Sequence, residues 1–552
     1  MTDFDNRAKK NKAIRALESK CKKNDIKALF QLGEYYRVGR FVEKDEFKSE
    51  DYLHKALFAF NKTTLSLNLV KLIDYCGFED ETLTFKGNNS KRSKLTVIVG
   101  NNGAGKTSVL VSIVKSLGWL TGAIRSKDGK GFHIQPLEIN NKITVGHASI
   151  LSEFSLSESD RFEMQLSKAK EGASSIAKSN FTEVRLLGEI YQLANSKNKD
   201  YNLPLMAYYP VSRAIDVTAN DIEQIRAITS HDAWGKMDGY NNALTHSSSF
   251  KLFFQWFRHF DDVINSTSKN VEKISKALVK LETELNLLKS LDNDSQESEK
   301  ITSLINEKKI EYKNLEASLG EDKASAPSKV LEHVINAIRV FMPELSNLRI
   351  ERVPRVEMYV DKSDIALNVL QLSQGEKSLM ALVADISRRL VLLNPSLENP
   401  LNGAGIVLID EVDLHLHPEW QQSILINLTK TFPSIQFVVS THSPQVLSTV
   451  HHDSIRVLNN SEIHRVHVPT LGEESKTILE DVLHVDSRPK NEMSKELKIY
   501  MEQLNKGEVD SEDVIKKRKV LEKHFGSGYS QFRLADMVIN RWKAVRNKRS
   551  DI

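Results

Sequence analysis

One glycine-rich stretch constrains this chain more than any other feature. Residues 100–107 have the sequence Gly-Asn-Asn-Gly-Ala-Gly-Lys-Thr, with four residues between the first glycine and the Gly-Lys-Thr group. This spacing is typical of a phosphate-binding loop, in which backbone N–H groups surround the phosphates of a nucleotide. Lys106 can reach the β- and γ-phosphates, and the Thr107 hydroxyl can ligate Mg²⁺. The residues predicted to hold the nucleotide are Gly100, Asn101, Asn102, Gly103, Ala104, Gly105, Lys106, Thr107 and Ser108.

The segments on either side of the loop support this interpretation. Residues 95–99 form a short, β-branched apolar run that predicts a buried strand. Residues 107–114 continue with the periodicity of a helix, whose N-terminus adds positive dipole at the phosphates. A strand, this loop and a helix in that order favour a nucleotide site over a chance glycine-rich turn.

Bulk properties narrow the class of protein. A length of 552 residues predicts several domains, and 40% hydrophobic with 27% charged residues is typical of a globular protein. The chain has no apolar run long enough for a membrane span and no apolar segment at its N-terminus, so we expect a cytoplasmic protein without membrane contact. Two cysteines, Cys21 and Cys76, predict neither a disulfide framework nor a cysteine metal site. A net charge of +4 does not decide for or against nucleic acid.

Two helical features stand outside the nucleotide-binding segments. Residues 28–56 carry small and apolar residues at helical spacing around a glycine turn, which indicates either one tetratricopeptide-like repeat or an ordinary helical hairpin. In residues 265–320, apolar residues recur at alternating steps of three and four, which predicts a heptad seam. The high charge between the seam positions favours a projecting antiparallel hairpin over a helix pair buried in a lobe.

Three further segments carry polar residues at places where a nucleotide site needs them. Residues 372–378, Leu-Ser-Gln-Gly-Glu-Lys-Ser, open a helix and offer a hydroxyl and backbone N–H groups to an anion. An apolar strand over 405–409 ends in Asp410 and Glu411, and another over 436–439 leads to Ser-Thr-His with His442. In open α/β sheets ligands bind at the carboxyl ends of the strands, where these residues are placed. Asp410 is suited to hold Mg²⁺ and Glu411 to polarise an attacking water.

The order of these motifs resembles the ABC-type ATPases of the SMC and RecF group, over about residues 63–485. The resemblance implies ATP as the nucleotide, Walker A at 100–108, a signature motif at 372–378, Walker B at Asp410 and Glu411, and His442 as the switch histidine. In such ATPases the signature of one subunit closes on the nucleotide of another. Ser373 and Gly375 would therefore contact ATP held by a partner protomer in a homo-oligomer that is at least a dimer.

Some positions of this pattern stay open. The glutamine of the Q-loop is either Gln135 or part of the turn at 210–213, and the sequence does not choose between them. His415 and His417 lie where the D-loop is expected, and without a third ligand they are a weak metal pair.

A narrower resemblance comes from the overall organisation. A repeat-like start, a short hairpin instead of a long coiled coil, Ser475–Leu479, the Arg488-Pro489 pair and a helical tail are similar to the PtuA-type ATPases of Septu anti-phage systems. This resemblance implies an HNH nuclease of the PtuB type as partner and, in the retron-attached systems, a reverse transcriptase with its multicopy single-stranded DNA (msDNA). It implies a regulatory ATPase with no nuclease site of its own, whose nucleotide state controls the nuclease.

The expected fold is α/β, an ABC-type P-loop ATPase with a mixed sheet flanked by helices. The predicted domains are a helical tetratricopeptide-like segment, an N-lobe with Walker A, an inserted coiled-coil hairpin, a C-lobe with signature, Walker B and His442, and a basic helical tail for partner docking. Their ranges are 1–60, 61–262, 263–325, 326–486 and 487–552.

Two other functions remain open from the sequence. A stand-alone repair ATPase would clamp DNA on ATP-dependent dimerisation and bind DNA strongly. A non-catalytic scaffold would keep ATP as a structural ligand, although the presence of both Asp410 and Glu411 argues against it.

Overall fold

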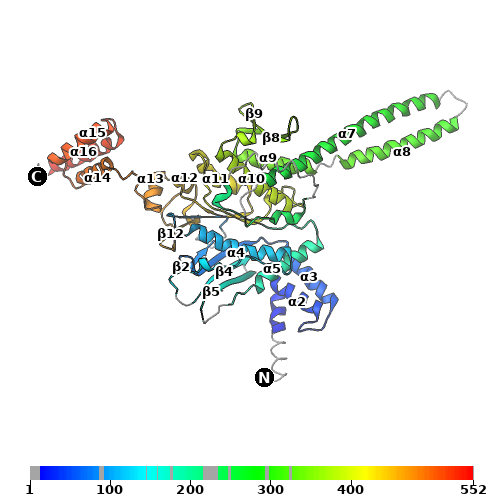
Figure 1. The fold of residues 1–552 in the computed structure, drawn as a ribbon, viewed down its shortest axis with the longest axis horizontal. Coiled ribbons are helices and arrows are strands. Elements are labelled where there is room, and N and C mark those ends of the chain that lie inside the picture. Colours follow the sequence, from blue (N-terminus) through cyan, green and yellow to red (C-terminus); the bar gives the residue numbers. More distant parts are fainter. Residues whose placement is uncertain are drawn as a thin grey trace, which may run out of the picture. The chain divides into compact units, whose positions relative to one another are not determined.

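The computed structural model describes residues 13–85, 93–143, 146–157, 160–173, 178–214, 234–245, 250–292, 298–322 and 326–550 (Figure 1). The chain divides into two compact units, Met1–Glu473 and Glu474–Ile552, which are described separately.

A six-stranded sheet with the order β13-β12-β3-β11-β10-β6 forms the centre of the first unit. Its strands are β3 (Leu95–Gly100), β6 (Leu205–Tyr209), β10 (Gly405–Ile409), β11 (Ile435–Ser440), β12 (Ile455–Asn459) and β13 (Glu462–Arg465). The five strands from β12 to β6 pair in parallel, and β13 adds an antiparallel edge. Every residue of β6, β10 and β11 is buried, which explains why these strands are continuous apolar runs.

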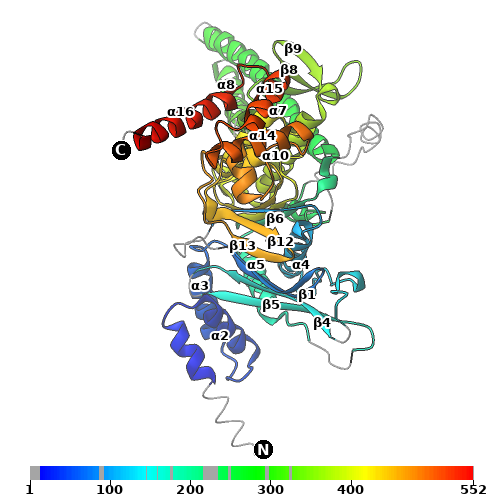
Figure 2. The ribbon, with the colours of Figure 1, turned by 90° about the vertical axis from the view of Figure 1, so that its left-hand side faces the viewer.

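A second, antiparallel sheet has the order β2-β1-β4-β5. It consists of β1 (Ser66–Tyr75), β2 (Phe78–Thr84), β4 (His147–Ser155) and β5 (Arg161–Ala169), and Figure 2 shows β1, β4 and β5 side by side. The helix α4 (Lys106–Arg125) contacts β1 and β4 of this sheet as well as β3, β6 and β11 of the central sheet. Because α4 is covered from both sides, it is apolar nearly all round.

The helix α4 is also the one described helix that is long and apolar enough to cross a membrane by length and composition. Most of its apolar stretch is buried between the two sheets, as expected for the core helix of a folded domain.

Among the helices before the sheets, α2 (Ile26–Val38) and α3 (Glu46–Phe60) each have an aspartate as N-cap, Asp25 and Asp45. They pack against each other, and α2 also contacts α5 (Thr182–Lys197). Gly33 lets them come close, since a Cβ there would lie 2.8 Å from the Leu53 side chain.

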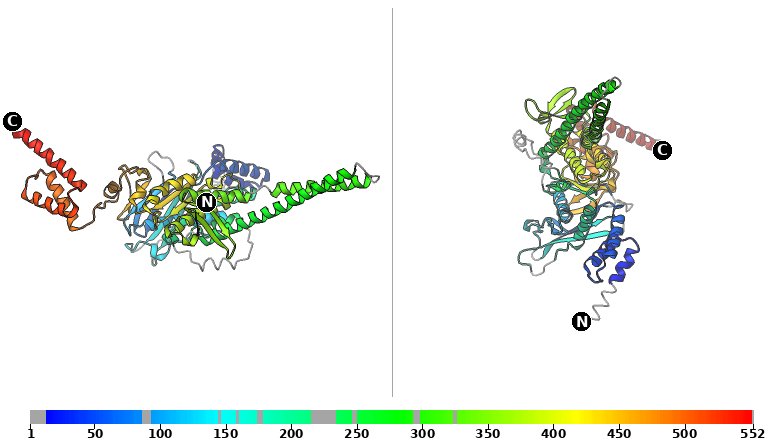
Figure 3. Two further views of the ribbon diagram at one scale, coloured as in Figure 1. Left: turned by 90° about the horizontal axis from the view of Figure 1, so that it is seen from above. Right: turned by 90° about the vertical axis from the view of Figure 1, so that its right-hand side faces the viewer.

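The longest helices are α7 (Phe250–Asp292) and α8 (Ser298–Asp322), which lie side by side in Figures 1 and 3. Leu281, Leu285 and Ile305 are buried between them. The helix α7 begins well before position 263, and Phe253, Trp256 and Phe257 near its start are buried. The polar break at 293–297 lies outside the described residues.

The remaining elements of the first unit surround the signature segment. A three-stranded sheet, β7 (Leu345–Glu351), β8 (Glu357–Lys362) and β9 (Ile365–Asn368), precedes α10 (Gln374–Leu393). The helices α9 (Ala326–Phe341) and α7 pack on α10, and α11 (Pro418–Thr431) and α12 (Pro444–Leu447) pack on each other.

The second unit is helical, with α13 (Ser475–Thr477), α14 (Glu492–Asn505), α15 (Glu512–Phe525) and α16 (Ser530–Ser550). It has its own apolar core, to which Leu497, Tyr500, Leu521 and Phe532 contribute. The predicted fold class is confirmed in its architecture: an α/β fold with a mixed sheet flanked by helices and a helical C-terminal region.

Candidate functional site

The carboxyl ends of three neighbouring strands bring the sequence motifs together. The strand β3 ends at Gly100, β10 at Ile409 and β11 at Ser440, and β11 pairs in parallel with both of the others. Parallel neighbours end at the same edge of a sheet, so the glycine-rich loop, Asp410-Glu411 and Thr441-His442 meet there.

Lys106 is the first residue of α4 and is 7% exposed. Its ammonium donates to the Gly100 carbonyl oxygen at 2.9 Å and lies 2.6 Å from Nε2 of His442. Burial lowers the pKa of Lys106, and the carboxylates of Glu411 and Asp410 oppose that shift. Burial also lowers the pKa of His442, and the nearby Lys106 charge lowers it further. The imidazole is therefore neutral near pH 7 and can accept a hydrogen bond from the ammonium.

Thr107 and the two carboxylates form the second part of the site. The Thr107 hydroxyl donates to Oδ2 of Asp410 at 2.7 Å. The Ser440 hydroxyl donates to Oδ1 of Asp410 and accepts the backbone N–H of Glu411 at 2.8 Å. Ser440 thus holds both residues of the Asp-Glu pair in place. Sequence reasoning missed this role, although Ser440 directly precedes the Thr-His pair at the end of an apolar strand.

The backbone of Glu411 is held in an uncommon conformation. Its φ is 47°, in the left-handed region that a glutamate rarely adopts. Such conformations cost about 1–3 kcal/mol and persist where the surrounding structure imposes them, often at functional sites. Here the Ser440 hydroxyl accepts the Glu411 N–H, which helps to hold this backbone conformation.

The glycine-rich loop is packed tightly against the β1–β2 turn. Gly105 has φ 99°, and a Cβ at this position would lie 2.7 Å from the Phe78 ring. Asn101, Asn102 and Gly103 are exposed, and Ala104 N–H closes a turn by donating to the Asn101 carbonyl at 3.1 Å. Ser108 is in the first turn of α4 and hydrogen-bonds Cys76.

The signature segment opens α10. Ser373 is the N-cap, and its hydroxyl accepts the Glu376 N–H while the Glu376 carboxylate accepts the Ser373 N–H, which makes a capping box. Lys362 adds an ion pair to Glu376 at 2.6 Å. A Cβ on Gly375 would lie 2.3 Å from the His415 carbonyl oxygen, so this position requires glycine. The segment 411–417 therefore lies against the start of α10.

The two histidines of the expected D-loop and the Q-loop candidates do not form one cluster in the described part of the chain. His417 caps α11 through Nδ1, which accepts the Glu419 N–H at 3.4 Å, and His415 has φ 60°. Gln135 precedes a short 3-10 turn, Pro136–Glu138, and is exposed. The turn after β6 also stays a candidate for the Q-loop.

The donor set fits a hard divalent cation beside a nucleotide. The Thr107 hydroxyl and the Asp410 carboxylate are adjacent, and Mg²⁺ binds through such oxygen ligands together with phosphate oxygens and water.

Comparisons with known proteins agree with this arrangement. One family model described as an "AAA domain" matches residues 70–323, and a second AAA domain model, whose description names a type IV TA system, matches residues 230–448. The chain is 36% identical to the "Retron Ec83 probable ATPase" of Escherichia coli over 517 residues, which cover 93% of this chain and 94% of that protein. It is 38% identical to the "Retron Vc95 probable ATPase" of Vibrio cholerae serotype O1 biovar El Tor over 442 residues, 79% of this chain and 82% of that protein.

A shorter similarity links the chain to a "Septu protein PtuA" of Bacillus mycoides (strain KBAB4). It is 35% identical over 106 residues, 19% of this chain and 14% of that protein. The identities over nearly the full length decide the family: this chain is an ATPase and belongs to the family of retron ATPases.

Proposed function

We propose that this chain is the regulatory ATPase of an anti-phage defence complex, and that its nucleotide state controls a separate nuclease. The observation that carries the proposal is the meeting of Lys106, Thr107, Asp410, Glu411 and His442 at one edge of the central sheet. Membership of the retron ATPase family supplies the defence context.

Each residue of the site has a proposed role. Residues 100–108 hold the phosphates of ATP, and Lys106 neutralises charge on the β- and γ-phosphates. Thr107 and Asp410 would hold Mg²⁺, which when bound neutralises charge that develops on the phosphates. Glu411 orients and polarises the attacking water, and His442 hydrogen-bonds the transferred phosphate.

The signature is proposed to act on a neighbouring copy. The hydroxyl of Ser373 and the backbone at Gly375 stand at the N-terminus of α10, where N–H groups and helix dipole favour an anion. In a dimer that sandwiches nucleotide, they would contact ATP held by the partner protomer. Turnover would then be slow, because two protomers must close before each hydrolysis.

Control of the nuclease follows from differential binding. ATP can shift the assembly only if it binds one state better than the other. We propose that the ATP-bound dimer restrains an HNH nuclease of the PtuB type and that hydrolysis releases it. A reverse transcriptase and its msDNA are proposed as further components because the full-length relatives are retron ATPases.

The decisive experiment is co-expression of the tagged chain with its neighbouring genes, followed by mass spectrometry and a nucleic-acid gel. We expect an HNH protein to co-purify, with nuclease activity that changes when ATP is added. A complex with Lys106→Ala should keep its partner and lose the response to ATP. If the chain purifies alone and binds duplex DNA with ATP, a DNA-clamping ATPase replaces this proposal.

A further inference from the structure

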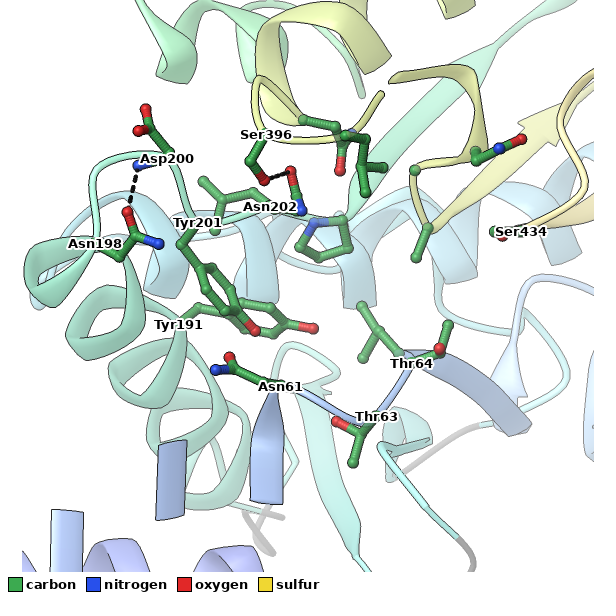
Figure 4. A pocket seen from close by; sticks show the side chains of 18 residues that line it. Asn61, Thr63, Thr64, Tyr191, Asn198, Asp200, Tyr201, Asn202, Ser396 and Ser434 are labelled. Atoms are coloured by element: carbon green, nitrogen blue, oxygen red, sulfur yellow. Dashed lines mark hydrogen bonds between the residues drawn. The ribbon is translucent and has the colours of Figure 1, made fainter. Parts of the chain in front are cut away.

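A polar cavity lies at the opposite edge of the central sheet from the glycine-rich loop. It has a volume of about 400 Å³ and is bordered by the segments that lead into β6, β10 and β11, together with the end of α3 (Figure 4). The five residues of β10 separate this edge from Asp410, which corresponds to roughly 16 Å at about 3.3 Å per residue. The cavity is therefore distinct from the nucleotide site.

The charge of the lining disfavours a phosphate ligand. Eighteen residues line the cavity, and Asp200 is the one charged residue among them. The lining offers no lysine or arginine to balance the charge of a phosphate group, and the Asp200 carboxylate would repel it. The ligand that fits is uncharged and differs in this respect from ATP.

Side-chain amides dominate the polar part of the lining. Five asparagines contribute: Asn61, Asn198, Asn202, Asn394 and Asn402. Within the described parts of the chain, the amides of Asn61 and Asn402 make no hydrogen bond, and both residues are exposed. The Oδ1 atom of Asn202 accepts the Ser396 hydroxyl at 2.9 Å, so its amide nitrogen can turn toward a ligand. An amide offers a donor beside an acceptor, which matches the hydrogen-bonding edge of a nucleobase.

Two tyrosines form an aromatic wall of the same cavity. Figure 4 shows the rings of Tyr191 and Tyr201 reaching into it. Tyr201 stacks on the buried Phe60 ring with centroids 5.9 Å apart and planes 13° apart, and Tyr191 meets Phe60 edge-on at 4.7 Å. Tyr191 is buried, whereas Tyr201 is partly exposed and is the ring on which a planar heterocycle would stack. Such stacking contributes about 1–3 kcal/mol per base in proteins that bind bases this way.

The wall is held in position before any ligand arrives. The Lys236 ammonium donates to Oδ1 of Asn195 at 2.7 Å and to the carbonyls of Lys199 and Tyr201. The Tyr240 hydroxyl donates to the Pro204 carbonyl at 2.7 Å. These bonds fix the loop between α5 and β6, and preformed sites bind small molecules with less ordering cost.

We propose that this cavity is a second small-molecule site, for a nucleobase or nucleoside without phosphate. The proposal rests on the amide edge, the aromatic wall, the lack of a lining cation and a volume within the roughly 300–1,000 Å³ range of ligand sites. It does not depend on the proposed control of a nuclease.

The test measures binding of adenosine, guanosine, cytidine and thymidine to the full-length chain by calorimetry, with D-ribose as the sugar alone. At least one nucleoside should bind with one-to-one stoichiometry, also in the presence of saturating ATP and in Lys106→Ala. Ribose should not bind, because its sugar ring is not aromatic and has no flat face to stack on Tyr201.

Two variants locate the site. Asn402→Ala removes an exposed amide and should weaken nucleoside binding about fivefold, the effect of losing one neutral hydrogen bond. Ser434→Phe places a ring in the cavity and should abolish binding. Asn540→Ala, an exposed asparagine of α16, is the matched control and should change nothing. Thermal melting checks that each variant is folded.

Four results would overturn the proposal. The first is that no nucleoside binds at millimolar concentration. The second is that bound nucleoside is displaced by ATP or lost in Lys106→Ala, which would place it in the nucleotide site. The third is that ribose binds as well as the nucleosides. The fourth is that folded Asn402→Ala binds like the unaltered chain.

Discussion

At the scale of single residues, the arrangement around Glu411 combines a strained backbone with a fixed partner. The Ser440 hydroxyl bonds both the Asp410 carboxylate and the Glu411 N–H, so one serine side chain sets the position of two acidic residues. The left-handed φ of Glu411 is then imposed by the site and is not a preference of the residue.

Glu411→Gln tests the proposed role of this carboxylate. The amide keeps the shape but cannot take a proton, so hydrolysis should fall about 100-fold or more while ATP still binds. Phosphate release and nucleotide binding are the two measurements. Glu419→Gln, at an exposed position of α11, is the control. An unchanged hydrolysis rate would show that Glu411 does not activate the water.

Gly375→Ala tests the contact between the signature segment and the 411–417 segment. The new Cβ would meet the His415 carbonyl at 2.3 Å, so either the start of α10 or this segment must move. We expect slower ATP hydrolysis with nearly unchanged nucleotide binding, because Lys106 and Thr107 are untouched. Gly528→Ala, where nothing lies within 4 Å, should behave like the unaltered chain. A loss of nucleotide binding equal to the loss of hydrolysis would contradict this expectation.

Asp385 is a buried charge on α10 with three partners. It pairs with Arg388 and Arg389 at 2.7 Å each and accepts the Tyr209 hydroxyl at 2.9 Å. Burial alone would raise the pKa of Asp385, but the Arg389 and Arg388 charges outweigh it and lower the pKa to about 2. The two arginines therefore stabilise the ionised form of Asp385, which contacts Tyr209 at the end of β6.

Asp385→Asn should lower the free energy of unfolding at neutral pH by about 3–5 kcal/mol, because it leaves two guanidinium groups buried without a counter-charge. A carboxylate whose pKa is lowered by folding stabilises the folded state fully at pH values above its ordinary pKa of 3.8. This stabilisation is lost as the pH falls toward the folded-state pKa of about 2. The difference in the free energy of unfolding between the variant and the unaltered chain, measured with denaturant, should therefore become smaller over that pH range. A difference that is the same at every pH would contradict the ionic explanation.

At the scale of elements, the leucines of α7 in the α7–α8 hairpin differ in burial: some face α8 and others face solvent. Leu285 is 8% exposed and faces α8, whereas Leu287 is 64% exposed. The heptad pattern explains the burial of Leu285, since apolar residues at alternating steps of three and four keep one seam against the partner helix.

Leu285→Asp and Leu287→Asp form a matched pair of variants in this hairpin. The first buries a carboxylate between the helices and should open the hairpin, with faster proteolysis of residues 265–320. The second adds a charge in solvent and should leave the proteolysis rate unchanged. Limited proteolysis with mass spectrometry measures both, and equal rates would show that α7 and α8 do not pack through this seam.

At the scale of the whole molecule, the chain consists of two units with separate cores. In Glu474–Ile552 the buried side chains of α14, α15 and α16 pack on one another, and Phe525, Tyr529 and Phe532 form a chain of ring contacts. A unit with its own apolar core can fold without the rest of the chain.

Residues 474–552 should therefore fold when expressed alone. Circular dichroism should show a helical protein with a cooperative thermal transition, and Leu521→Asp, in its core, should abolish that transition. The exposed Leu534→Asp is the control, which should melt like the unaltered fragment. A helical signal that melts without cooperativity would show that the core needs the first unit.

The sequence by itself determined the fold class and the family-level chemistry. A phosphate-binding loop has a local signature, because only glycines and a Lys-Thr pair at this spacing make the backbone and side chains fit phosphates. The sequence likewise predicts where β10 and β11 end, because each is an apolar run followed by polar residues, Asp410-Glu411 after the first and Thr441-His442 after the second. The confirmed fold class was predicted from these strands. The roles of these residues, the domain limits and the nuclease partner stay predictions.

The tertiary structure alone decided which distant residues touch. The contacts of Ser440 with Asp410, of Lys106 with His442 and of Gly375 with His415 join positions 30, 336 and 40 residues apart. Each depends on the register of parallel strands or on the packing of a loop on a helix, which no local pattern encodes. The cavity lined by asparagines depends even more on the tertiary structure. Its asparagines come from separate loops, where asparagine is common because of its turn preferences, so the sequence gives no reason to group them.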